Sequence, residues 1–179
     1  LGKADYRELV YIILRNIIIA IFISLLIIIF KPLLIHALGE IFETSIQTKN
    51  LIEDYISIRV LSAPAELVIY VLIGFYLGIQ RTFILSLLII ILSLLNIFFS
   101  IYFVKELNLN VTGVALGTFI AAYLTVISFL IYTYYFIIKK FNVIPRFNSK
   151  SVFNHKKLFK LLNINFNIFV RTVLLTFSF

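Results

Sequence analysis

Long apolar runs dominate the pattern of hydrophobic and polar positions along this 179-residue chain. Within residues 67–138 the only charged residues are Arg81, Lys105 and Glu106. The uncharged pieces 82–104 and 107–138 both exceed the roughly 20 residues that an α-helix needs to cross the hydrocarbon core of a bilayer. Strands of a membrane barrel would show short alternating segments instead. The pattern therefore predicts an all-α bundle of transmembrane helices.

The breaks between the apolar runs predict four complete spans and the start of a fifth. The complete spans are expected at about residues 9–30, 56–80, 82–104 and 111–138, and the fifth begins near Asn163. Lys31-Pro32 closes the first span, because proline cannot donate to the helix ladder and lysine reaches the headgroups. Residues 33–54 are expected to form an outer loop.

Composition supports a membrane protein, with 62% hydrophobic residues, 13% charged residues and a mean hydropathy of +1.09. The chain has no cysteine, which excludes disulfides and thiolate sites within it. It has no methionine either, and it stops inside an apolar segment. We therefore expect an internal part of a longer protein, whose partners are the lipid bilayer and the missing transmembrane helices.

Basic residues favour one side of the predicted bundle. That side carries Lys3, Arg7, Arg15, Arg81, Lys139, Lys140, Arg146, Lys150, Lys156, Lys157 and Lys160. Because Lys and Arg are retained in the cytoplasm, this side is predicted to be cytoplasmic. The organisation is then a partial amino-terminal bundle at 1–138, a basic cytoplasmic connector at 139–162 and a truncated helix at 163–179. Basic residues in a connector are what membrane topology demands, so nucleic acid is excluded as a partner.

Polar side chains at membrane depth need an explanation, because moving them from water into the hydrocarbon core costs free energy. In the second span Arg59 and Glu66 are seven residues apart on one face, with Pro64 between them to kink the helix. Glu66 either faces a water-filled cavity as a protonatable or cation-attracting group, or it pairs with Arg59. Arg15, near the end of the first span, is expected to snorkel to the interface.

The third and fourth spans carry further candidates. Ser93, Asn96 and Ser100 share one stripe of the third span, which should face protein and either bind a substrate or cation or join helices by hydrogen bonds. In the fourth span Gly113 and Gly117 form a smooth packing ridge. Its neighbour Thr118 either lines a cavity or bonds back to the helix.

Catalytic chemistry has no support in the pattern. His36 and His155 lack partners spaced for a metal site or a catalytic triad, and no glycine-rich phosphate loop occurs. We therefore expect no enzyme, no catalytic residue, no metal site and no cofactor.

Several stretches resemble the MATE (multidrug and toxic compound extrusion) transporters, in particular their DinF-like branch. They are Tyr55-Ile-Ser-Ile-Arg-Val-Leu-Ser-Ala-Pro-Ala65, Gly74-Phe-Tyr-Leu-Gly-Ile-Gln80, Leu95-Asn-Ile97, Val111-Thr-Gly-Val-Ala-Leu-Gly-Thr118 and Asn167-Ile-Phe-Val-Arg-Thr172. The resemblance implies the third to sixth helices of an amino-terminal six-helix bundle, the connector and the start of the seventh helix.

The resemblance also implies an ion site and a function. Asn96 matches an asparagine of the family's ion site, but the acidic position four residues later is Ser100 here, and Glu66 is a candidate replacement for that acid. Thr118 matches a position bordering the same cavity. The implied function is efflux of organic, typically cationic small molecules by antiport with H⁺ or Na⁺. The alternatives are a related flippase for lipid-linked precursors and a non-transporting remnant or scaffold.

Overall fold

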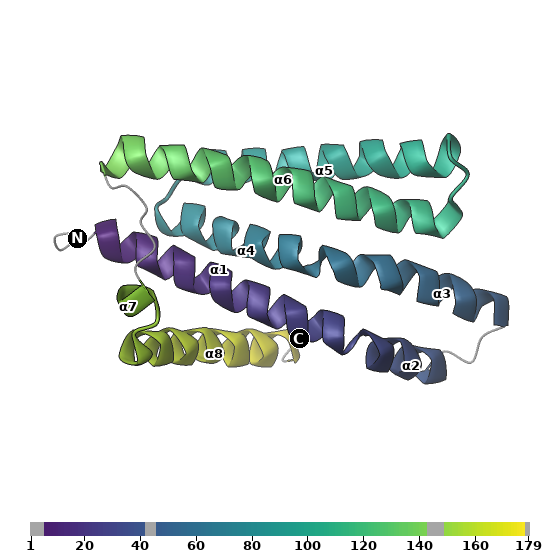
Figure 1. Ribbon diagram of the computed structural model, residues 1–179, viewed down its shortest axis with the longest axis horizontal. Coiled ribbons are helices and arrows are strands. Elements are labelled where there is room, and N and C mark those ends of the chain that lie inside the picture. Colours follow the sequence, from purple (N-terminus) through teal and green to yellow (C-terminus); the bar gives the residue numbers. More distant parts are fainter. Residues whose placement is uncertain (1–5, 42–45, 143–148, 178–179) are drawn as a thin grey trace.

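The chain folds into a helical bundle, seen in a computed structural model that describes residues 6–41, 46–142 and 149–177 (Figure 1). The elements in chain order are α1 (Tyr6–Ile29), α2 (Lys31–Ile41), α3 (Ile46–Arg59), the 3-10 turn η1 (Val60–Ser62), α4 (Ala63–Gly78), α5 (Thr82–Lys105), α6 (Asn110–Phe141), α7 (Ser149–Val152) and α8 (His155–Phe177). The predicted all-α fold is confirmed.

Adjacent helices bury one shared apolar core. Helix α5 packs along α6, α1 packs along α4, and α3 and α4 both contact α6. The core includes Ile13 from α1, Leu72 from α4, Leu88 from α5 and Val126 from α6. Long apolar side chains elsewhere on these helices stay exposed, which is the arrangement expected where lipid rather than water surrounds a bundle.

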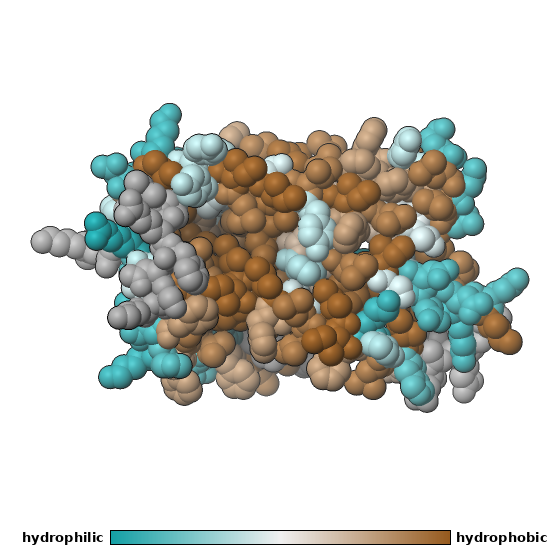
Figure 2. Space-filling view, in the orientation of Figure 1, coloured by the Kyte–Doolittle hydropathy of each residue, from teal (hydrophilic) through white to brown (hydrophobic). Residues whose placement is uncertain are grey.

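Five helical stretches among the described residues are long and apolar enough to cross a bilayer. They are Tyr6–Ile29, Ile46–Gly78, Thr82–Lys105, Asn110–Phe141 and His155–Thr176. Figure 2 shows a broad apolar middle with hydrophilic residues gathered at both ends of the long axis. The start of α1, the α4–α5 turn, the end of α6 and the start of α8 lie at the same end (left in Figure 1), as the predicted alternation of spans requires.

Two expectations about helix boundaries were wrong. Within the expected loop 33–54, residues 33–41 belong to helix α2 and residues 46–54 belong to helix α3. The last helix begins at His155 rather than near Asn163, so the expected connector 139–162 contains the end of α6, α7 and the first turns of α8. In both places polar residues mark where the chain leaves the lipid, and a helix can continue beyond that boundary.

The predicted disturbance at Pro64 takes the form of a tightened turn. Val60–Ser62 is a 3-10 helix in which the Ala63 amide donates to the Val60 carbonyl. Pro64 then lies in the first turn of α4, where its missing N–H needs no partner. Pro32 is likewise in the first turn of α2, which explains why it ends α1 without ending helical structure.

Candidate functional site

The α5–α6 crossing brings together three of the predicted site residues. Asn96 Oδ1 accepts a hydrogen bond from the Ser100 hydroxyl at 3.0 Å and lies 3.5 Å from Thr118 Oγ1. Thr118 Oγ1 is also 3.1 Å from the Val114 carbonyl oxygen, so its proton has a nearer acceptor within α6. All three site residues are half-buried. The cluster is a small group of neutral oxygens at membrane depth.

The predicted glycine ridge creates this crossing. A Cβ atom added at Gly117 would lie 2.5 Å from Ser100 Oγ and 2.6 Å from the Ser100 amide nitrogen. At Gly113 an added Cβ would lie 3.1 Å from the Phe103 carbonyl carbon. The two helix backbones therefore approach more closely where Ser100 faces Gly117 than at Gly113. Small residues at this crossing allow the contact, as in other membrane helix pairs.

Ser93 does not join the cluster. It lies on the exposed surface of α5, whereas Asn96 and Ser100 turn toward α6. The three residues do share a stripe, but the stripe is wider than the contact between the helices, so only part of it meets α6.

Glu66 belongs to a second polar group around η1. Its carboxylate pairs with the Arg59 guanidinium, and Arg59 Nη2 lies 3.1 Å from Glu66 Oε2. The Ser62 hydroxyl lies 3.0 Å from Glu66 Oε1 and 2.6 Å from the Arg59 carbonyl oxygen. Pro64 places this group at the start of α4, because the 3-10 turn sets Ser62 beside both charged side chains.

No polar contact joins the Glu66 group to the Asn96 group within the described part of the chain. Glu66 is engaged by Arg59 and Ser62, and Asn96 by Ser100 and Thr118. The geometry thus supports the interpretation of Glu66 as an ion-pair partner.

A third polar group, around Arg15, departs from the expectation of snorkelling. Arg15 is only 2% exposed, so its side chain does not reach the interface. Its Nε and Nη2 donate to the carbonyl oxygens of Val152 at 3.0 Å and Ser151 at 2.6 Å, and its Nη1 donates to Glu8 Oε1 at 2.8 Å. Arg15 thereby holds the end of α7 against α1.

Glu8 also links α1 to α8, because Lys157 Nζ lies 2.6 Å from Glu8 Oε2. Deeper along the same pair of helices, Asn165 Nδ2 lies 3.4 Å from Asn16 Oδ1. The sequence contained a signal for the Glu8–Arg15 pair, since these residues are seven apart, as Arg59 and Glu66 are. The contacts to α7 and α8 come from more than 130 residues away, and no local pattern indicates them.

The Asn96 cluster brings together three neutral side-chain oxygens, from Asn96, Ser100 and Thr118. Amide and hydroxyl oxygens are the ligands that hard cations take in proteins. None of the three side chains changes its charge near neutral pH. Within the described residues no group of three or more His, Asp or Glu side chains is arranged to hold a metal ion.

Comparison with known proteins decides the family. The sequence model of the MatE family matches residues 1–102, more than half of the chain. The chain belongs to the MatE family. The matched range contains Glu66, Asn96 and Ser100 and ends before Thr118. Membership points to a transporter rather than an enzyme, and together with the five apolar helices it identifies a multi-pass inner-membrane protein.

A curated relative agrees with the MatE assignment. DNA damage-inducible protein F of Escherichia coli (strain K12) is 41% identical over 73 residues, which are 41% of this chain and 16% of that protein. The resemblance to the DinF-like branch is thus confirmed, and the matched segment spans about a sixth of that relative's length. No solved structure matches the chain.

Proposed function

We propose that the full-length protein is a cation-coupled efflux transporter that exports organic, mainly cationic compounds by antiport. The observation that carries this proposal is the Asn96 cluster, in which an amide oxygen is held beside two hydroxyls where α5 and α6 cross inside a MatE-family bundle. Cation binding there would alter the fit of α5 against α6. Coupling requires that the cation binds one conformational state of the bundle more tightly than the other.

Of the two coupling ions considered, Na⁺ suits this cluster better than H⁺. Asn96, Ser100 and Thr118 offer oxygens but no group that takes up a proton near neutral pH. A carboxylate at position 100 would supply such a group, and this chain has serine there. Proton coupling would therefore need an acid elsewhere. Glu66 is the candidate acid within the predicted spans, and its pairing with Arg59 supports a structural role for it instead.

Gradient-driven export from proteoliposomes tests the proposal. The full-length protein would be reconstituted with ethidium as the probe cation, and its movement followed under an imposed Na⁺ gradient or an imposed H⁺ gradient. We expect the Na⁺ gradient to drive transport and Asn96→Ala to reduce that transport at least tenfold. Ser86→Ala, at an exposed position on the same helix, is the matched control and should transport normally.

Two results would contradict this assignment. Equal Na⁺-driven transport by Asn96→Ala and the unsubstituted protein would remove the α5–α6 cluster from coupling. Transport driven only by H⁺ and lost in Glu66→Gln would move the coupling site to the Arg59–Glu66 group.

A further inference from the structure

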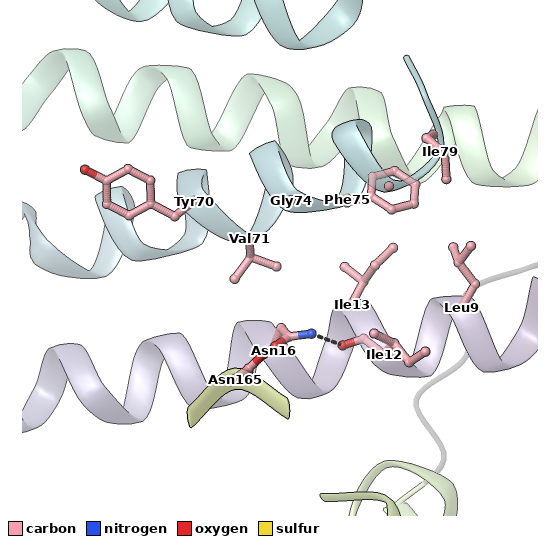
Figure 3. A pocket seen from close by; sticks show the side chains of 11 residues that line it. Leu9, Ile12, Ile13, Asn16, Tyr70, Val71, Gly74, Phe75, Ile79 and Asn165 are labelled. Carbon is pink, nitrogen blue, oxygen red and sulfur yellow. Dashed lines mark hydrogen bonds between the residues drawn. The ribbon is translucent and has the colours of Figure 1, made fainter. Parts of the chain in front are cut away.

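Two adjoining hollows flank α1 near its amino-terminal end. One, of about 530 Å³, lies between α1 and α4, and Figure 3 shows the side chains that line it. The other, of about 440 Å³, lies between α1 and α8. Both are lined by Ile12, Asn16 and Asn165, so they meet at these three residues. Together they form one groove, which we call the α1 groove.

The α4 wall of the α1 groove is unusually smooth and open. Gly74 and Gly78 stand four residues apart on α4, and a Cβ atom added at either would meet nothing within 4 Å. In membrane proteins such a pair normally lets another backbone approach closely. Here the two glycines line the hollow beside Val71 and Phe75, and α1 forms the opposite wall without coming within 4 Å of a Cβ added at either glycine. The α4 wall is therefore flat and apolar along Gly74 and Gly78, where no side chain fills the hollow; we call this surface the Gly74–Gly78 strip.

The other part of the groove is basic. Arg15, Lys157 and Lys160 line the hollow beside α8, and Glu8 is the acid among its lining residues. Arg15 and Lys157 share Glu8 through contacts of 2.8 Å and 2.6 Å, so that acid is fully engaged. Lys160 is exposed and has no acidic partner among the described residues. The groove thus combines a free cation at its mouth with an apolar wall.

We propose that the α1 groove binds an anionic phospholipid, with the phosphate at Lys160 and Lys157 and an acyl chain along the Gly74–Gly78 strip. Lysines near the start of α8 lie at the end of the bundle where headgroups are found, and basic pockets between membrane helices are suited to anionic headgroups. The helices that form the groove belong to stretches long and apolar enough to cross a bilayer, so a membrane lipid can supply the acyl chain. A soluble anion would leave the apolar wall unfilled.

Lipid retention by the purified full-length protein tests this. Native mass spectrometry would count bound phosphatidylglycerol and phosphatidylcholine after delipidation and addition of each lipid. We expect phosphatidylglycerol to bind more tightly, and Lys160→Gln to weaken its binding by about fivefold, the effect of one surface cation. Lys140→Gln removes the same charge from an exposed site on α6 and is the matched control. If both variants bound phosphatidylglycerol equally weakly, the loss would reflect the total surface charge rather than a site at Lys160, and the proposal would be overturned.

Filling the strip tests the apolar part separately. Gly74→Leu places a side chain in open space and improves helix propensity, so the protein should melt no lower while losing phosphatidylglycerol retention. A sharp fall in melting temperature would show that another helix already covers the strip, and would overturn the proposal. Displacement of the lipid by inorganic phosphate would also overturn it, because a bare anion cannot compete for the acyl-chain contacts. Since binding is measured without an ion gradient, its failure is distinct from failure of export.

Discussion

Arg15 shows how one buried charge organises the end of the molecule that carries the connector. All of its guanidinium nitrogens have partners, which are two α7 carbonyls and the Glu8 carboxylate. Arg15 is only 2% exposed, so removing it would leave the two α7 carbonyls without their buried donor, while Glu8 would keep Lys157. A side chain that looks like an interfacial cation in the sequence is therefore a structural centre.

Replacing Arg15 should destabilise the protein strongly. Arg15→Gln removes one of the two cations that pair with Glu8 and leaves at least one buried α7 carbonyl without a donor, and an unpaired buried acceptor costs about 2 kcal/mol. Thermal unfolding of the full-length protein in detergent measures the loss. Lys156→Gln, at an exposed site on α8, is the control and should unfold normally. Equal melting of the two variants would show that the Arg15 contacts contribute nothing.

The sequence identified polar residues at membrane depth, but it did not determine their partners. Asn96 and Ser100 were predictable as a pair because four residues separate them on one helix. The pairing of Arg59 with Glu66 followed from the same helical geometry and was one of two open alternatives. Arg15 was misinterpreted because its partners Ser151 and Val152 become neighbours only through folding.

At the scale of elements, the α5–α6 hairpin depends on two glycines that are not equivalent. An added Cβ at Gly117 would meet backbone atoms of Ser100 at 2.6 and 2.8 Å. Relieving this clash would require the α5 backbone to move, which costs more free energy than rotating a flexible side chain. At Gly113 the nearest atoms are 3.1 Å away, so a slight shift relieves the contact. Gly117 therefore fixes how near Ser100 and Asn96 come to α6.

Alanine substitutions at Gly117 and Gly113 should lower the stability of the protein by different amounts. Gly117→Ala forces the helices apart and should lower stability by about 2 kcal/mol, the usual cost of overpacking, despite the better helix propensity of alanine. Gly113→Ala should cost less. Gly74→Ala, where an added Cβ meets nothing, isolates the propensity effect and should be neutral or stabilising. Melting temperatures rank the three, and Gly117→Ala melting as high as Gly74→Ala would contradict the close crossing.

Helix existence was predictable and helix ends were not. Each predicted span overlaps one of the five long apolar helical stretches among the described residues, because a bilayer demands some 20 consecutive apolar residues. The length of an apolar run detects only the part of a helix that lies inside the lipid, and it does not show where the helix begins or ends outside it. It missed α2 and the part of α3 before residue 56, which contain Lys31, Glu53 and Asp54, and it placed the start of α8 after its basic first turns.

At the scale of the whole molecule, α1 and α8 are joined at one end of the bundle. Glu8 contacts Lys157 at 2.6 Å, and Asn16 contacts Asn165 at 3.4 Å. The resemblance to the MATE transporters implies that α1 belongs to the first bundle and that α8 is the first helix of the second. Alternating access moves one bundle against the other around a central site. In the proposed transport cycle, opening toward this end would require the Glu8–Lys157 contact to break.

Locking that contact should stop export. The chain has no cysteine, so Glu8→Cys with Lys157→Cys introduces one reactive pair into it. A direct disulfide is not suitable, because a Glu and a Lys that meet at their tips hold their Cα atoms too far apart. A short, cleavable bifunctional thiol reagent can span the gap. We expect ethidium export to be lost after cross-linking and to return after cleavage, while each single-cysteine variant treated alike keeps exporting. Full export by the cross-linked protein would show that α1 and α8 remain together throughout the cycle, and the boundary between the moving bodies would then lie beyond α8.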